Sequence, residues 1–229
     1  MQFKKNIEHH KITGIMIALF LILSFIISAP ILAQTETEAE TETVENEKAV
    51  YINASRLEYQ EEKTILSGGV RIRKDDTTIN ALQGELFRDE QKMILEEEID
   101  VEYSDGRVKS KLLTAFLQSE EYIFENEAVL NYILSDGEEM ILHSDYLKIF
   151  GDDSSFTAEK NVEIDYDNQK FRGDKADYDG ESEMMELTGN VEIEEEEDWV
   201  RSDRATFNLK EGEEGYTAEG NVEIKMILD

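Results

Sequence analysis

The stretch Glu186–Glu194 reads ELTGNVEIE, and a near copy of its centre, EGNVEI, returns at Glu219–Ile224. Its residues alternate strictly. Leu187, Gly189, Val191 and Ile193 fall on one face of an extended chain, and the acidic and amide residues between them fall on the other. Alternation with a period of two is typical of a half-buried β-strand. The stretch therefore predicts a strand with an apolar inner face and an acidic outer face.

The same pattern occurs six times along the chain. Aligning the sequence on the valine of GNVEI places equivalent residues at Val70, Ile99, Ala128, Val162, Val191 and Val222. A period near 30 residues that is sustained six times indicates a repeat architecture.

A second element with a small residue at its centre precedes each of these strands. The small residues are Ala54, Ala81, Ser110, Ser144, Gly173 and Ser202. Both alignments place one longer step between the third and fourth repeats. An insertion around residues 135–139 explains that step.

These repeats predict an all-β protein. The connectors are too short for crossover helices, so neighbouring strands are expected to be antiparallel. Glycines inside the strands, at Gly68, Gly69, Gly189 and Gly220, are expected to mark bulges or bends that curl the sheet. We therefore expect residues 50–229 to form twelve strands in an antiparallel β-jellyroll or curled sheet, built from six two-strand repeats of about 30 residues. Bulk composition alone also fits a disordered chain, but the alternating pattern excludes that reading.

The composition excludes several classes of function. The net charge of −31 repels phosphates, which argues against nucleic acids and anionic membrane surfaces as partners. The chain has no cysteine, so disulfides and thiol catalysis are excluded.

The N-terminus is typical of an export segment. Three lysines are followed by residues 12–33, which are uncharged and mostly apolar. We expect a signal peptide over residues 1–33 that is cut after Ala33. An uncleaved membrane anchor is the alternative, because the segment is also long enough to span a bilayer. Residues 34–49 are acidic and are expected to be a flexible linker.

No residues are predicted to perform catalysis or to hold a metal or cofactor. His143, Ser144 and Asp145 are consecutive on a strand, so they point to opposite faces and cannot form a triad. The acidic runs 96–98 and 194–198 lack the spacing of a calcium loop and are expected to be solvated. Trp199, the only tryptophan, is expected at a sheet boundary, where lipid contact is conceivable.

Three segments resemble the OstA-like domain of the lipopolysaccharide-transport proteins, the LptA family. They are INASRLEYQEEKTILSGGVRI (52–72), RGDKADYDGESEMMELTGNVEI (172–193) and RSDRATFNLKEGEEGYTAEGNVEI (201–224). The resemblance implies a periplasmic β-jellyroll that binds lipopolysaccharide or a related glycolipid in its apolar interior. It also implies end-to-end contacts with OstA-like domains of inner- and outer-membrane transport components, or with further copies of the chain in a head-to-tail homo-oligomer.

Fourteen residues are expected to line this interior: Leu66, Val70, Ile72, Leu95, Ile99, Val101, Leu130, Val162, Ile164, Leu187, Val191, Ile193, Val222 and Ile224. Two other functions stay open. The chain could be an inner-membrane-anchored LptC-like subunit of the same pathway, or an acidic β-repeat structural protein with a dry core and no ligand.

Overall fold

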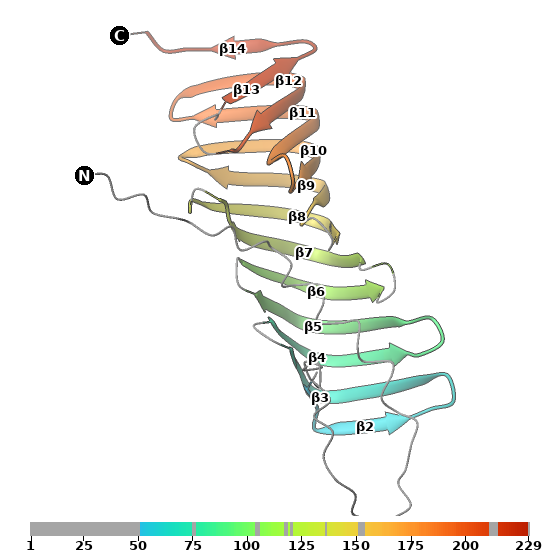
Figure 1. Ribbon diagram of the computed structural model, residues 1–229. Helices are drawn as coiled ribbons and strands as arrows, with labels where there is room; N and C mark the ends of the chain where they lie inside the picture. Colours follow the sequence, from blue (N-terminus) through green and yellow to red (C-terminus); the bar gives the residue numbers. More distant parts are fainter. Residues whose placement is uncertain are drawn as a thin grey trace, which may run out of the picture.

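A computed structural model describes residues 51–74, 77–103, 106–116, 119, 121–135, 137–150, 154–210 and 215–228. The expected export segment and the acidic linker lie outside these residues. The described chain is all-β and forms one antiparallel sheet whose strands follow one another in chain order (Figure 1). Its strands are β1 (Tyr51–Asn53), β2 (Arg56–Tyr59), β3 (Lys63–Lys74), β4 (Thr77–Phe87), β5 (Lys92–Tyr103), β6 (Gly106–Phe116), β7 (Glu121–Ile133), β8 (Glu139–Phe150), β9 (Phe156–Tyr166), β10 (Gln169–Asp179), β11 (Met184–Glu195), β12 (Asp198–Asn208), β13 (Gly215–Glu219) and β14 (Glu223–Lys225).

The strand count differs from the expected twelve at the two ends of the sheet. The first expected strand is broken into β1 and β2, and both pieces pair with β3. The last is broken into β13 and β14, which both pair with β12. Among the residues that the structure describes, each broken end strand has a neighbouring strand on one side only. The ten strands between them are continuous.

Each continuous strand bends near its middle, where its pairing register shifts. The bends divide the sheet into two half-sheets. Half-sheet A contains the second halves of the odd-numbered strands and the first halves of the even-numbered strands, and half-sheet B contains the remaining halves. The bends themselves form one continuous edge, here called the corner. The sheet is thereby folded over its own apolar face, as in a jellyroll.

Two consecutive residues with positive φ form the bend of each odd-numbered strand, for example Gly189 (φ 74°) and Asn190 (φ 49°) in β11. Glycine and asparagine adopt this left-handed conformation at the lowest cost. The four strand glycines expected to mark bends, namely Gly68, Gly69, Gly189 and Gly220, all have positive φ. That prediction is confirmed, and the GN of the repeated motif is explained by the bend.

The small residue of each even-numbered strand lies directly opposite the aligned residue of the preceding strand. The paired residues are Val70 and Ala81, Ile99 and Ser110, Ala128 and Ser144, Val162 and Gly173, and Val191 and Ser202. The two sequence alignments therefore identified pairs of residues that lie opposite each other on neighbouring strands at the corner. Small side chains suit it because the backbone turns most sharply there.

The longer repeat step also has a structural counterpart. Five residues, 134–138, connect β7 to β8, whereas two residues make each equivalent connection at 75–76, 104–105, 167–168 and 196–197. The predicted insertion of five residues is confirmed at this place: three of them lengthen the connection, and β7 and β8 are each one residue longer than β5 and β6.

Candidate functional site

The candidate site is the apolar space between the inner faces of the two half-sheets. Buried aliphatic and aromatic side chains from β3 to β12 form one continuous hydrophobic cluster there. In β5, for example, Met93 and Leu95 of half-sheet B and Ile99 and Val101 of half-sheet A all point inward, and each is at most 5% exposed. The cluster therefore runs along nearly the whole stack of strands.

Twelve of the fourteen expected interior residues are buried in this cluster. They are Leu66, Val70, Ile72, Leu95, Ile99, Val101, Leu130, Val162, Ile164, Leu187, Val191 and Ile193. The expected enclosed position is wrong for Val222 and Ile224, which are 46% and 59% exposed. They belong to the broken final strand, which pairs with β12 on one side and has no partner on its other side among the described residues.

Sequence reasoning missed about twice as many buried apolar residues as it found. The missed residues lie mainly in the even-numbered strands and the first halves of the odd-numbered ones, and they include Ile79, Met93, Val108, Leu113, Phe124, Met140, Leu142, Leu147, Phe156, Phe171, Met185 and Phe207. Their signal was present, because they continue the period-two alternation away from the bend. Leu142, for instance, precedes the small residue Ser144 by two.

The interior is closely packed along the stack. A cavity of about 20 Å³ lies between Ile79, Val108 and Phe124, and it has room for roughly one water molecule. Farther along, Phe171 of half-sheet A meets Phe207 of half-sheet B edge to face, with ring centroids 4.7 Å apart. An acyl chain could lie between the half-sheets only if these side chains moved or the half-sheets separated.

The corner is held by a repeated side-chain contact. An asparagine amide on one strand donates a hydrogen bond to an aspartate carboxylate on the preceding even-numbered strand. The pairs, here called corner pairs, are Asn161 with Asp145 (2.6 Å), Asn190 with Asp174 (2.8 Å) and Asn221 with Asp203 (2.9 Å). These contacts join successive repeats along the edge where the two half-sheets meet.

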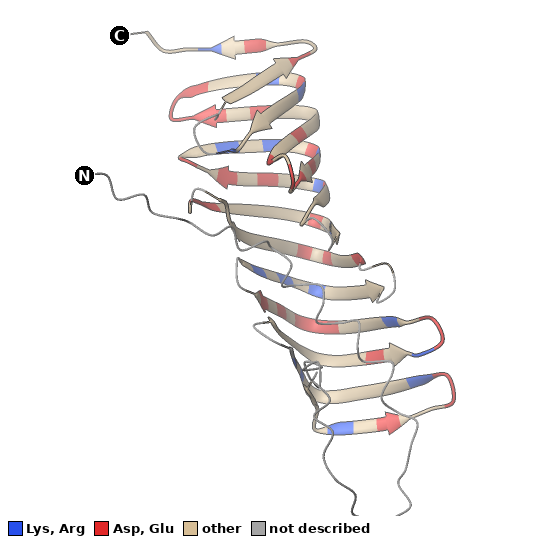
Figure 2. Cartoon of the chain, viewed as in Figure 1, with Lys and Arg blue, Asp and Glu red and all other residues tan. Residues whose placement is uncertain are grey.

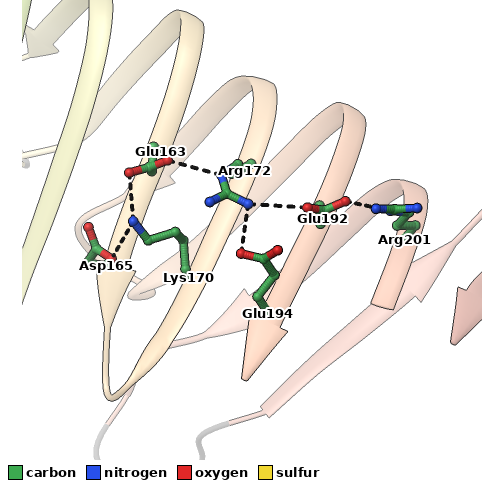
Figure 3. A network of polar contacts seen from close by, with 7 residues as sticks. All are labelled: Glu163, Asp165, Lys170, Arg172, Glu192, Glu194 and Arg201. Atoms are coloured by element: carbon green, nitrogen blue, oxygen red, sulfur yellow. Dashed lines mark hydrogen bonds and ion pairs between the residues drawn. The ribbon is translucent and has the colours of Figure 1, made fainter. Parts of the chain in front are cut away.

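The outer face carries the charges (Figure 2). In half-sheet A, Arg172 on β10 lies between acidic side chains of both neighbouring strands (Figure 3). Its guanidinium contacts Glu163 at 3.0 Å, Glu192 at 3.2 Å and Glu194 at 2.8 Å. Hydrogen bonds from Lys170 and then from Arg172 hold the pKa of Glu163 below its usual value. The network therefore offsets the repulsion between carboxylates on adjacent strands.

Both ends of the sheet expose apolar side chains. At one end Tyr51, Leu57 and Tyr59 are each more than 60% exposed. At the other end Ile224 and Leu228 are 59% and 85% exposed. Large exposed apolar side chains beside unpaired strand edges are typical of surfaces that pair with another chain.

The remaining sequence candidates do not form a chemical centre together. Ser144 is buried and its hydroxyl donates to the carbonyl of Tyr146, whereas His143 and Asp145 are exposed on the outside. Trp199 lies beneath the guanidinium of Arg201, 4.3 Å from it. Among the described residues, no cluster of His, Asp and Glu could hold a metal ion, and none of them forms a helix able to cross a membrane.

Comparisons with known proteins identify the family of the chain. The sequence model of the family described as LptA/(LptD N-terminal domain) LPS transport protein matches residues 51–213. LptH, the LptA-homologous periplasmic component of the lipopolysaccharide transport device of Pseudomonas aeruginosa, aligns in structure with a TM-score of 0.43 and 8% identity, over 80% of this chain and 97% of that chain. None of the curated proteins matches the chain. Because the family match covers most of its length, the chain belongs to the LptA/LptD N-terminal domain family of LPS transport proteins.

Proposed function

We propose that this protein carries lipopolysaccharide or a related glycolipid across the periplasm, with the acyl chains held between its two half-sheets. The observation that carries the proposal is the continuous apolar cluster along the strand stack. Contact with that cluster would remove acyl methylenes from water at about 0.8 kcal/mol each. The charged outer face keeps the carrier soluble, and the glycolipid head group would project into solvent.

The two ends supply the connections that such a bridge requires. In the described part of the chain, β14 and the β1–β2 pair each have an unpaired side and exposed apolar residues, among them Tyr59 and Ile224. We infer that each end pairs with an OstA-like domain of an inner- or outer-membrane component, or with the opposite end of a second copy. Strand addition would satisfy the free backbone groups and cover the apolar side chains together.

Export of the chain follows from residues 1–33, read as a signal peptide. If the segment is cut after Ala33, the protein is a free periplasmic carrier. If it is retained, the protein is an anchored subunit of the LptC type. Sequencing the N-terminus of the protein recovered from cells distinguishes the two, because cleavage leaves Gln34 as the first residue.

The interior can be probed without reshaping it. Met93, Met140 and Met185 are at most 2% exposed inside the cluster, whereas Met226 is 66% exposed on the terminal tail. Photo-methionine, a diazirine analogue of nearly the same shape, should crosslink acyl chains at the three interior positions in cells. Mass spectrometry of the peptides gives the site, and Met226 reports contact at the tail.

A second candidate is a structural repeat protein that holds no ligand. The close packing around the 20 Å³ cavity favours it. It predicts a purified protein free of acyl chains and no lipid adducts at Met93, Met140 or Met185. That result would reject the carrier proposal.

Replacing Val191 with Asp would not test whether the interior binds lipid. Val191 is 1% exposed, so a carboxylate there would be buried without a partner and would destabilise the whole fold. Loss of lipid would then report unfolding and not the loss of a contact.

A further inference from the structure

The margin opposite the corner is the place where the two half-sheets could part. Along this margin the hairpin turns of half-sheet A face those of half-sheet B. The connection between β7 and β8 is three residues longer than its counterparts in half-sheet A. Ser135, in this connection, contacts a residue of half-sheet B. The longer connection therefore joins the two half-sheets at this margin.

Two contacts and one buried side chain lie at this margin, and the contacts join the half-sheets. Ser135 donates a hydrogen bond of 2.9 Å to the carboxylate of Glu183, a residue 48 positions away in the β10–β11 turn. The ring of Tyr132 meets that of Tyr178 edge to face at 6.2 Å. Leu134 lies between these contacts in the sequence and is only 4% exposed, although it has left the strand. We call these five residues the latch.

The inner side of the latch is buried: Tyr178 and Phe156 are each 4% exposed. Tyr178 stacks on Phe156 with ring centroids 5.0 Å apart, which continues the aromatic packing into the interior. Burial raises the pKa of the Tyr178 hydroxyl, consistent with the exclusion of water at this point. The outermost contact, between Ser135 and Glu183, is exposed and therefore weak.

Beyond the latch, toward the C-terminus, the margin is open. A hollow of about 250 Å³ lies between the β9–β10 turn of half-sheet A and the β12–β13 region of half-sheet B. Its walls include Tyr166, Phe171, Phe207 and Tyr216. Since Phe171 and Phe207 also belong to the hydrophobic cluster, the hollow ends on side chains of the packed interior.

We propose that the latch closes a side entrance to the interior, through which an acyl chain enters or leaves without travelling from an end of the stack. This inference rests on the proposed lipid-carrier function. Separation of Ser135 from Glu183 and of Tyr132 from Tyr178 frees the margin next to the hollow. The acyl chain then passes between the half-sheets while the corner pairs hold their opposite edge.

The test follows uptake of cis-parinaric acid, a fluorescent fatty acid, by the full chain in stopped flow. Ser135→Ala removes the outer contact, and uptake and release should both become about two- to tenfold faster. Glu183→Gln should accelerate them less, because its amide oxygen still accepts the hydrogen bond but without a charge. Glu181→Gln is the matched control, because it removes the same charge from the same turn without a latch contact. Urea denaturation of each variant separates faster opening from loss of the fold.

A locked variant gives the opposite test. The chain has no cysteine, so Ser135→Cys combined with Glu183→Cys can be joined by a short bis-maleimide and compared with the same variant blocked by N-ethylmaleimide. The joined protein should lose the rapid phase of uptake. Equal uptake by the joined and blocked proteins would overturn the side entrance in favour of the ends. If the wild-type chain takes up no fatty acid and its interior methionines acquire no lipid, the carrier function itself fails.

Discussion

Asn190 donates its side-chain amide to the carboxylate of Asp174 at 2.8 Å across the corner of the folded sheet. The same pair occurs 29 residues earlier as Asn161 and Asp145. The aspartate follows the small residue of one element, and the asparagine precedes the valine of the next. The repeated motif therefore has two structural roles: it supplies the left-handed bend, and it joins the bend to the neighbouring strand.

The first prediction concerns Gly189, which precedes Asn190. A Cβ at this position would lie 2.4 Å from Oδ2 of Asp174, and φ is 74°. Gly189→Ala should lower the free energy of unfolding by about 1–3 kcal/mol from backbone strain, and by more from the collision. Adding Asp174→Ala should recover the collision part, so a double-mutant cycle by urea denaturation should show positive coupling.

Gly69 offers a matched control for that cycle. Its φ is 86°, but nothing lies within 4 Å of the position its Cβ would take. Gly69→Ala should show the strain alone. Gly189→Ala should lower the free energy of unfolding by more than Gly69→Ala does. Equal decreases would contradict the role given to the close approach of Asp174.

The second prediction concerns Arg172 at the centre of the outer network. Replacing it with Met removes the cation that contacts Glu163, Glu192 and Glu194. Because these groups are partly exposed, Arg172→Met should lower the free energy of unfolding by only about 1 kcal/mol in low salt. The loss should shrink in 1 M NaCl, where the Debye length falls to about 3 Å. A loss that is unchanged by salt would indicate packing and not charge.

The third prediction concerns the pH dependence of the same variant. The pKa of Glu163 is lowered by Lys170 and Arg172, and that of Glu192 is lowered chiefly by Arg201. A lowered folded-state pKa contributes stability above the unfolded value, about 4.3, and loses it as the pH falls through the folded value. The difference between wild type and Arg172→Met should therefore be full at pH 7 and decline below about pH 4. Denaturation curves at pH 7, 5 and 3 measure it, and a difference that persists at pH 3 would contradict this account.

A structural feature could be predicted from the sequence when its cause lies within one strand or one repeat. Features that depend on contacts between distant segments could not. Alternation around Val191 predicted the inner face because a strand places every second side chain on one side. The same letters at Val222 predicted burial wrongly, since burial depends on a following strand that the motif does not encode. The insertion near Ser135 was located by counting repeats, but its contact with Glu183 arises only when the two half-sheets face each other. The Asp174–Asn190 pair could have been found, because both positions repeat with the period of the strands.

The fourth prediction concerns the terminal strand. Ile224 lies on β14, is 59% exposed and has no strand beyond it among the described residues. Ile224→Lys should leave the free energy of unfolding nearly unchanged, because an exposed side chain contributes little to the folded monomer. It should weaken end-to-end association, since a charge on an edge strand opposes pairing with another edge. Analytical ultracentrifugation over a range of concentrations measures this, with Leu82→Lys as the control: Leu82 is 39% exposed but lies on β4, which is paired on both sides, with β3 and β5. If Leu82→Lys disperses the oligomers as well as Ile224→Lys does, association occurs through the sides of the stack and the end-to-end bridge is wrong.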